Sequence, residues 1–328
     1  MSSDRRLGLA MAALTALLWG FLGIALKVAL DWVPPITIVW LRFAAAFVVL
    51  AVLLGVRRPQ CLRILVRPPV LALVAAAGLT ANYVFYLLGV HFTSPGHAQV
   101  LIQLAPLLLA GVGVLFFGER LTRGQALWGL VALAGMGLFY RDQLTQLVGA
   151  DGAAAGDGSL AADAARGNLW ILVAAVSWVV YAGLQKRLTA RDVTPQDLNL
   201  LLYLFPAVVL TPFVEWDTLA PLSGAQWGMM AFLAANTLVA YGALGEALKR
   251  LPAHEVSLII ILNPLITLAT MAVLTLLEVT WIEPERISPW GYGAAVVVLI
   301  GVIGVLRRPR ARSVRPVVGP DRHEGEVV

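Results

Sequence analysis

Cysteine and charge are both scarce in this sequence. The only cysteine is Cys61, so the chain cannot form a disulfide within itself. Charged residues make up 13% of the 328 positions, which is about half of their share in an ordinary soluble domain. Hydrophobic residues make up 59%. This composition indicates a protein whose main solvent is the lipid bilayer.

Motifs for metal binding and hydrolytic catalysis are also missing. The pair His254 and Glu255 lacks the second histidine of a zinc-binding helix, and no Gly-x-Ser-x-Gly nucleophile elbow occurs. The net charge of +5 comes from basic residues without interleaved aromatic residues, which disfavours a nucleic-acid interface. We therefore expect no enzyme activity, cofactor, metal or nucleic-acid partner.

Long apolar runs are present instead. A helix needs about 20 mostly apolar residues to cross the hydrocarbon, and only helices and closed barrels satisfy their backbone groups there. Alternating ten-residue strands are absent, which disfavours a barrel. The first run is too long for a signal peptide, and Lys27 lies where a cleavage site would follow. Ten runs qualify as spanning helices: 8–30, 36–54, 70–90, 95–117, 124–140, 168–186, 197–214, 226–248, 253–277 and 288–306.

The basic residues are distributed asymmetrically around these runs. If the ten spans alternate in direction, nineteen Lys and Arg residues fall on one side of the membrane. The loops on the other side hold three, Arg141, Arg166 and Arg286. Because basic loops stay in the cytoplasm, the sequence predicts a multi-pass inner-membrane protein with both termini in the cytoplasm.

Two proline-flanked segments, SPGHAQVLIQLAP at 94–106 and LPAHEVSLIIILNP at 251–264, share one pattern. Aligning the two halves of the chain at an offset of 158 or 159 residues matches further positions. The matched pairs are Trp19 with Trp178, Lys27 with Lys186, Tyr83 with Tyr241, Pro106 with Pro264 and Glu119 with Glu278. Several matches at a nearly constant offset predict a duplicated unit.

Each copy contains five of the expected spans, an odd number, so the second copy must enter the membrane from the opposite side. We expect two inverted five-helix repeats, over 1–140 and 168–306. An external Ala/Gly/Asp-rich linker would join them over 141–167, and a basic, disordered cytoplasmic tail would follow over 307–328. Inverted repeats are typical of secondary transporters that work by alternating access. The alternative is a structural bundle without a pathway.

The segments LLWGFLGIALK and GERLT in the first copy, with VSWVVYAGLQK and LNPL in the second, resemble the EamA-type members of the drug/metabolite transporter superfamily. Within that superfamily the organisation and aromatic content of the spans are most similar to YddG-type exporters of aromatic amino acids. The resemblance implies an all-α, ten-helix membrane protein with a central cavity lined mainly by spans 1, 3, 4, 6, 8 and 9. It also implies export as the usual direction.

Four charged residues within or next to the spans are candidates for function, because charge in hydrocarbon is costly. Arg42 is a candidate for a structural pair, for contact with a substrate carboxylate, or for snorkelling to the interface. Lys27 fits snorkelling. Glu246 precedes Arg250 by four residues, the spacing of a helix-surface ion pair, with proton coupling as the alternative. Glu255 follows Pro252 in a first helical turn, where a carboxylate stabilises the helix end.

Polar and aromatic side chains within the spans are candidates for the substrate pocket. Helix–helix hydrogen bonds and interfacial aromatic belts are the alternatives, and for histidine plain hydration at the interface is another. The candidates are Trp19, Asn82, Tyr83, Tyr86, His97, Gln99, Gln103, Trp178, Tyr181, Gln185, Asn236, Tyr241, Ser257 and Asn263.

An aromatic pocket with few fixed charges suits flat, amphiphilic solutes. We expect export of aromatic or bulky neutral amino acids. Efflux of lipophilic drugs or cations, favoured by cation–π contacts, is the first alternative, and a non-transport scaffold is the second. The expected partners are a small-molecule substrate and the lipid bilayer. One ten-helix chain could form a complete pathway as a monomer.

Overall fold

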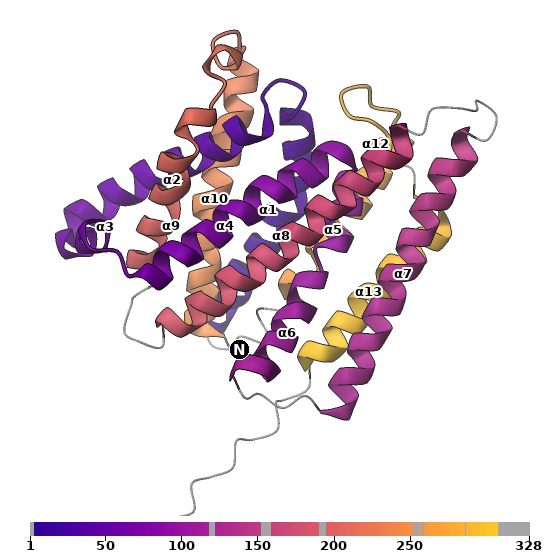
Figure 1. The fold of residues 1–328 in the computed structure, drawn as a ribbon, viewed down its shortest axis with the longest axis horizontal. Coiled ribbons are helices and arrows are strands. Elements are labelled where there is room, and N and C mark those ends of the chain that lie inside the picture. The colour runs from indigo at the N-terminus through magenta and orange to yellow at the C-terminus, as the bar shows by residue number, and fades with distance from the viewer. Residues whose placement is uncertain are drawn as a thin grey trace, which may run out of the picture.

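The protein is α-helical throughout the part of the chain that the structure describes (Figure 1). This computed structural model describes residues 3–117, 122–151, 159–189, 195–251, 256, 259–285 and 287–307. The helices long and apolar enough to cross a membrane include α1 (Ser3–Ala29), α2 (Pro35–Arg57), α4 (Val70–Phe92), α8 (Ser159–Thr189) and α10 (Gly224–Arg250). The segment Pro95–Phe116 also qualifies. It comprises α5 (Pro95–Leu101) and most of α6 (Leu104–Phe117).

Each of the ten predicted stretches contains helix among its described residues, and a few short elements lie between the stretches. The other elements, in chain order, are η1 (Pro59–Leu62), α3 (Arg63–Val66), α7 (Arg123–Asp151), α9 (Pro195–Val209), η2 (Thr211–Phe213), η3 (Trp216–Thr218), α12 (Asn263–Leu276) and α13 (Pro289–Arg307). Apolar segments of α9, α12 and α13 are shorter than a typical spanning helix. The chain is therefore an all-helical membrane protein.

The helices next to the predicted linker are longer than the sequence indicated. The sequence predicted an external Ala/Gly/Asp-rich linker over 141–167; within that range α7 continues to Asp151 and α8 begins at Ser159. Alanine has the highest helix propensity of all residues, so the Ala-rich start of α8 forms helix despite its polarity. Residues 152–158 lie outside the described residues, as does the tail from 308 onward.

Proline interrupts the same region in both halves of the chain. Pro106 has no N–H to donate to the carbonyl of Ile102, and that carbonyl accepts from Ala105 instead, at 2.9 Å. The result is the turn between α5 and α6. In the second half, Leu262 donates to Ile259 at 3.1 Å and α12 begins directly after, with Pro264 in its first turn. Both proline-flanked segments are thus broken helices.

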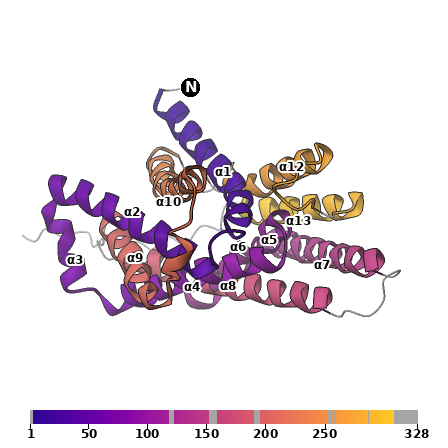
Figure 2. The ribbon, with the colours of Figure 1, turned by 90° about the horizontal axis from the view of Figure 1, so that it is seen from above.

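The most extensive helix contacts are those of α4 with α8, of α7 with α13 and of α1 with α10 (Figure 2). Each of these contacts joins the first half of the chain to the second. The largest core cluster also draws on both halves, with Leu26, Phe43 and Leu79 packed together with Ile171 and Leu233. The two halves therefore share one core.

Glycine residues allow the backbones of α7 and α13 to pack very close together. A Cβ atom on Gly301 would lie 2.4 Å from the backbone nitrogen of Ala132, and one on Gly135 would lie 2.7 Å from that of Val298. Neither position has room for a side chain. Small residues that let two backbones approach in this way are typical of helix pairs in membranes.

Candidate functional site

A buried arginine lies at the centre of the helix bundle. Arg42 belongs to α2 and is only 2% exposed. Its Nε donates a hydrogen bond to Thr237 Oγ1 of α10 at 3.1 Å, and its guanidinium carbon lies 5.0 Å from the centre of the Tyr83 ring on α4. Its Nη2 has no hydrogen-bond partner among the described residues. The side chain therefore does not reach the membrane surface, which excludes the snorkelling interpretation.

Aromatic rings from five helices are linked to this arginine through Tyr83. The hydroxyl of Tyr83 donates to that of Tyr241 at 3.1 Å, which joins α4 to α10. Trp19 of α1 meets Tyr241 edge-on, with ring centres 5.5 Å apart. Phe43 of α2 contacts Tyr83 and Tyr203 of α9, at 4.6 and 5.8 Å. We call Arg42 and these five rings the central cluster.

Tyr86 lies one helical turn beyond Tyr83 and has a buried hydroxyl with no partner among the described residues. It faces Gly23 of α1, where an added Cβ would lie 3.6 Å from the Tyr86 hydroxyl and 3.7 Å from Gln99 Nε2. Gln99 is buried and donates to the backbone carbonyl of Trp19 at 3.1 Å. Tyr86 and Gln99 therefore extend the central cluster toward α5.

The asparagines mainly join helices. Asn82 donates from Nδ2 to the carbonyl of Ala174 at 2.9 Å, which ties α4 to α8. Asn236 donates to the carbonyl of Leu18 at 2.9 Å, which ties α10 to α1. The Oδ1 atoms of Asn236 and Asn263 are buried without a partner among the described residues. The hydrogen bonds of Asn82 and Asn236 therefore fit the alternative of helix–helix contact, although Asn236 keeps one buried oxygen without a partner among the described residues.

The other predicted pocket residues are more dispersed. Tyr181 is buried and its hydroxyl is hydrogen-bonded to Gln185 on the same helix. Trp178 is half-buried against the largest core cluster, and Gln103 is buried in the turn between α5 and α6. Residues outside the described part of the chain include the candidates Ser257 and Glu255, together with Glu119 and His254.

His97 does not lie in the central cluster, and it is not hydrated at an interface. It is 4% exposed, its ring lies 5.5 Å from that of Phe139, and its Nε2 is 2.5 Å from Asn168 Oδ1. The plain-hydration alternative is therefore wrong. Pro95 starts α5 within the bundle, so the histidine in its first turn packs between α7 and α8.

Glu285 is a buried residue that the sequence analysis missed. It lies in the segment between α12 and α13 and is 7% exposed. Its Oε1 accepts hydrogen bonds from Ser94 Oγ and from the backbone N–H of His97, the latter at 3.1 Å. Burial raises the pKa of the Glu285 carboxyl above its ordinary value. One feature of the sequence indicated this burial, Gly96 in the segment SPGH. A glycine has no side chain, and this leaves room for the Glu285 carboxylate.

Lys27 lies close to the same corner of the bundle. Its Nζ donates to the carbonyls of Val90, His91 and Thr93, at 3.3, 3.1 and 2.9 Å. These carbonyls belong to the C-terminal end of α4, where helical hydrogen-bond partners run out. Lys27 therefore caps α4 from α1, and its snorkelling to the interface stays a prediction.

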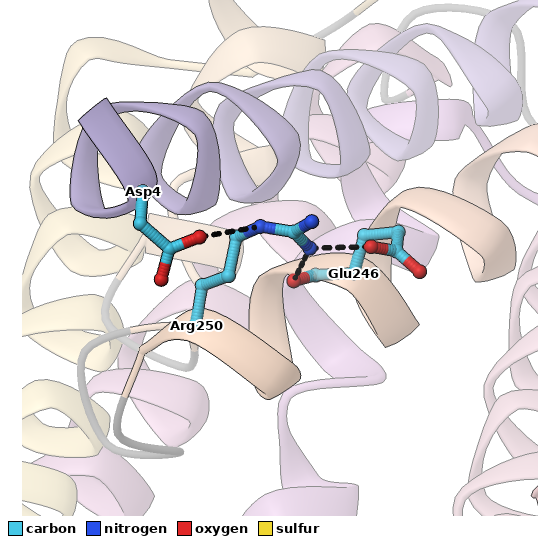
Figure 3. Close-up of polar contacts among 3 residues, drawn as sticks. All are labelled: Asp4, Glu246 and Arg250. Atoms are coloured by element: carbon cyan, nitrogen blue, oxygen red, sulfur yellow. Dashed lines mark hydrogen bonds and ion pairs between the residues drawn. The ribbon is translucent and has the colours of Figure 1, made fainter.

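The opposite end of α1 is tied to α10 by charge (Figure 3). Arg250 donates to the backbone carbonyl and to the carboxylate of Glu246 one turn earlier, and its Nε lies 3.1 Å from Asp4 Oδ1. The ion pair of Glu246 and Arg250 is the one that the four-residue spacing predicted. Asp4 is 73% exposed, so solvent screens its contact with Arg250 and the contact adds little to stability.

Two cavities lie outside the central cluster. One, of about 300 Å³, lies beneath the segment between α12 and α13 and is lined by residues that include Glu278 and Glu283. The other, of about 460 Å³, lies between α1 and α10 and is lined by residues that include Phe21, Met229 and Trp281.

The fold and the site define a class of protein, a helical membrane transporter with a buried aromatic and cationic centre. The EamA-like transporter family model matches residues 6–141 and 165–307. The chain belongs to this family, and it is a transporter rather than an enzyme. It is a multi-pass inner-membrane protein.

The relatives agree with this assignment. The chain is 33% identical over 306 residues to the "Uncharacterized inner membrane transporter YhbE" of Escherichia coli, covering 92% of each chain. It is 26% identical over 314 residues to a "Probable amino-acid metabolite efflux pump" of the same species, covering 89% of this chain and 92% of that protein. A solved crystal structure that is 20% identical shares the fold, with a TM-score of 0.60 and coverage of 92% and 98%.

Proposed function

We propose that the protein is a secondary transporter that exports small amphiphilic metabolites, above all aromatic or bulky neutral amino acids, by alternating access. The central cluster supports this proposal because its rings offer flat apolar surfaces for stacking in the interior of the helix bundle. The efflux pump of Escherichia coli that resembles the chain is named for amino-acid metabolites, which points to the same class of substrate.

The observation that carries the proposal is the contact between Tyr83 and Tyr241. These two residues are 158 apart, the offset at which the two halves of the sequence align. In a pair of inverted repeats, equivalent residues touch only at the twofold axis that relates the repeats. We infer that this axis passes between the two hydroxyls, so the central cluster lies where the halves meet, as in other inverted-repeat transporters.

The helix pairing supports ten spanning segments in two inverted repeats. If the halves are equivalent, α1 corresponds to α8 and α4 to α10. The contact of α4 with α8 then becomes the contact of α10 with α1, and both pairs pack extensively. The broken helices at Pro106 and Pro264 are equivalent in the same way. Discontinuous helices at such positions are typical of substrate sites in secondary transporters.

The proposal also sets an orientation. The basic residues place both termini, the Arg250 end of α10 and the start of α1 in the cytoplasm. Glu285 and Lys27 then lie at the external end. Rocking of one repeat against the other would open either the Arg250 end or the Glu285 end, and would expose the central cluster to one side at a time.

Transport by the purified protein in liposomes tests the function. We expect counterflow of labelled phenylalanine and tryptophan, reduced at least about tenfold by Tyr241→Ala, a loss of the size expected for a well-packed aromatic contact. The matched control is Tyr140→Ala, since Tyr140 is exposed on α7. Movement of tetraphenylphosphonium without amino acids would favour drug efflux instead. Vesicles that move neither solute would contradict the proposal and favour the scaffold.

A further inference from the structure

We propose that Arg42 is the anchor for a carboxylate group of the transported solute, so that the central cluster selects amphiphilic carboxylates over amines and cations. This inference rests on the proposed function and specifies its substrate class. It starts from a buried charge that has no acidic partner among the described residues.

The guanidinium of Arg42 lies at mid-depth in the helix bundle. It is held by Thr237, the middle residue of α10, which runs from Gly224 to Arg250. The side chain is 2% exposed. An arginine cannot lose its proton under ordinary conditions, so this site holds a full positive charge far from both ends of the bundle.

No acidic side chain pairs with Arg42 among the described residues, whose ion pairs involve other arginines. The ionisable groups that act on it are Tyr83 and Tyr86 of α4 and Tyr241 of α10. Phenol rings and one threonine hydroxyl offset only part of the several kcal/mol that an unpaired buried ion costs. Arginines with a purely structural role in a membrane protein are usually paired, so this one has an unused capacity for an anion.

Two unused donors lie in this environment. Arg42 Nη2 and the Tyr86 hydroxyl are both buried without a partner among the described residues. A carboxylate has two oxygens that accept hydrogen bonds. Hydrogen bonds between a guanidinium and a carboxylate are charge-assisted, and they are stronger than hydrogen bonds between neutral groups. A carboxylate bound at Arg42 would satisfy the orphaned nitrogen and neutralise the charge at once.

The rings of the central cluster then determine the rest of the solute. Tyr83, Tyr241 and Trp19 form an aromatic wall next to the guanidinium, suited to an apolar or aromatic side chain. A cationic solute would meet an uncompensated positive charge in a low-dielectric site. The same feature therefore argues against the lipophilic-cation alternative, although aromatic rings alone would favour cations.

The first test uses the unmodified protein in liposomes. Phenylalanine and 3-phenylpropionate, which both have a carboxylate, should compete with labelled phenylalanine. Phenethylamine and phenylalaninamide, which lack it, should compete at least about tenfold more weakly, since tenfold corresponds to about 1.4 kcal/mol. Equal competition by the amines would overturn the inference while leaving amino-acid transport intact. Vesicles inert to every compound would instead overturn the proposed function, and this inference with it.

The second test uses variants of Arg42. Arg42→Gln should raise the KM for phenylalanine at least about tenfold, and Arg42→Lys should recover part of the loss because the charge remains but the planar fork is gone. Arg57→Gln, at the exposed end of the same helix, is the matched control and should behave as the unmodified protein. Transport by Arg42→Gln with an unchanged KM would overturn the inference. If that variant does not fold, the competition series above decides the matter.

Discussion

Glu285 sets a pH dependence at the scale of a single residue. Its buried carboxyl has a pKa raised above the ordinary 4.5, chiefly by desolvation, with the bonds from Ser94 and His97 acting in the opposite direction. Between 4.5 and the raised value the folded protein holds a proton that the unfolded chain has lost. Stability therefore falls as the pH rises through that window, and stays at the lower level above it.

Replacing this residue tests that dependence. The charged group facing Glu285 is Lys27 of α1; His97 of α5 contacts it through its backbone N–H, and Tyr292 of α13 is also near. Glu285→Gln keeps an oxygen that can accept from Ser94 but removes the ionisation. We expect a flatter plot of melting temperature against pH, and a variant more stable than the unmodified protein at neutral pH.

The matched control for Glu285 is Glu283→Gln in the same segment, where the side chain is exposed. That variant should keep the slope of the unmodified protein. Thermal unfolding in detergent between pH 4 and pH 8, a range around the ordinary values of carboxyl and imidazole groups, provides the measurement. Identical slopes for the Glu285 and Glu283 variants would show that Glu285 is not the responsible group.

Gly96 of α5 allows a steric test of how closely Glu285 approaches this helix. A Cβ there would lie 2.6 Å from both carboxylate oxygens of Glu285 and 2.7 Å from Leu268 Cδ2. Gly96→Ala should destabilise the protein by about 1–3 kcal/mol, the usual cost of overpacking. Gly111→Ala, which meets nothing within 4 Å, should cost nothing. Melting temperatures in detergent compare the two, and equal values would argue against the close approach of Glu285.

At this scale the alignment of the two halves of the sequence pointed to a pair of residues that the structure brings together. Tyr83 and Tyr241 align at an offset of 158 and their hydroxyls are in contact, as expected if they lie on the axis of the proposed inverted repeats, and Trp19 contacts Tyr241 from α1. Glu285 could not be found in the same way. Its burial depends on how a connecting segment folds back onto α5, and that segment has no equivalent in the compact GERLTRG of the first copy.

Among the elements, the pair of α7 and α13 depends on close backbone approach. Gly301→Val should destabilise the protein by about 3 kcal/mol, because the space at Gly301 is already filled by the backbone of Ala132. Gly137 of α7, where an added Cβ would meet nothing within 4 Å, gives the control variant Gly137→Val. Unfolding in detergent measures both, and a harmless Gly301→Val would contradict the packing of this pair.

The helices themselves were largely predictable, because long apolar runs can form nothing else in a membrane. The end of α7 and the start of α8 show where this reasoning stops. The polarity of residues 141–151 and 159–167 indicated a linker, but polarity disfavours burial rather than helix, and the alanines at the start of α8 favour helix in water as well. The sequence predicted 95–117 and 253–277 as single spans, whereas turns interrupt the helix just before Pro106 and Pro264, where the missing proline N–H acts locally.

The whole molecule is tested by its orientation in the membrane. Fluorescent protein fused after Val328 should be bright, because it folds in the cytoplasm, and alkaline phosphatase inserted after Gly152 should be active outside. The physical reason is the excess of basic residues on the side of the termini. Phosphatase activity at the C-terminus, or none between α7 and α8, would contradict the inverted arrangement.

The pairing of α4 with α8 and of α1 with α10 has a consequence for how the chain is made. When the ribosome has completed the first five helices, the partners of α1 and α4 do not yet exist. Arg42 then has no Thr237 to bind, and the faces that later form the shared core border lipid. We expect a chain truncated near residue 150 to be degraded by membrane quality control, and two separately synthesised halves to persist only when both are produced in one cell.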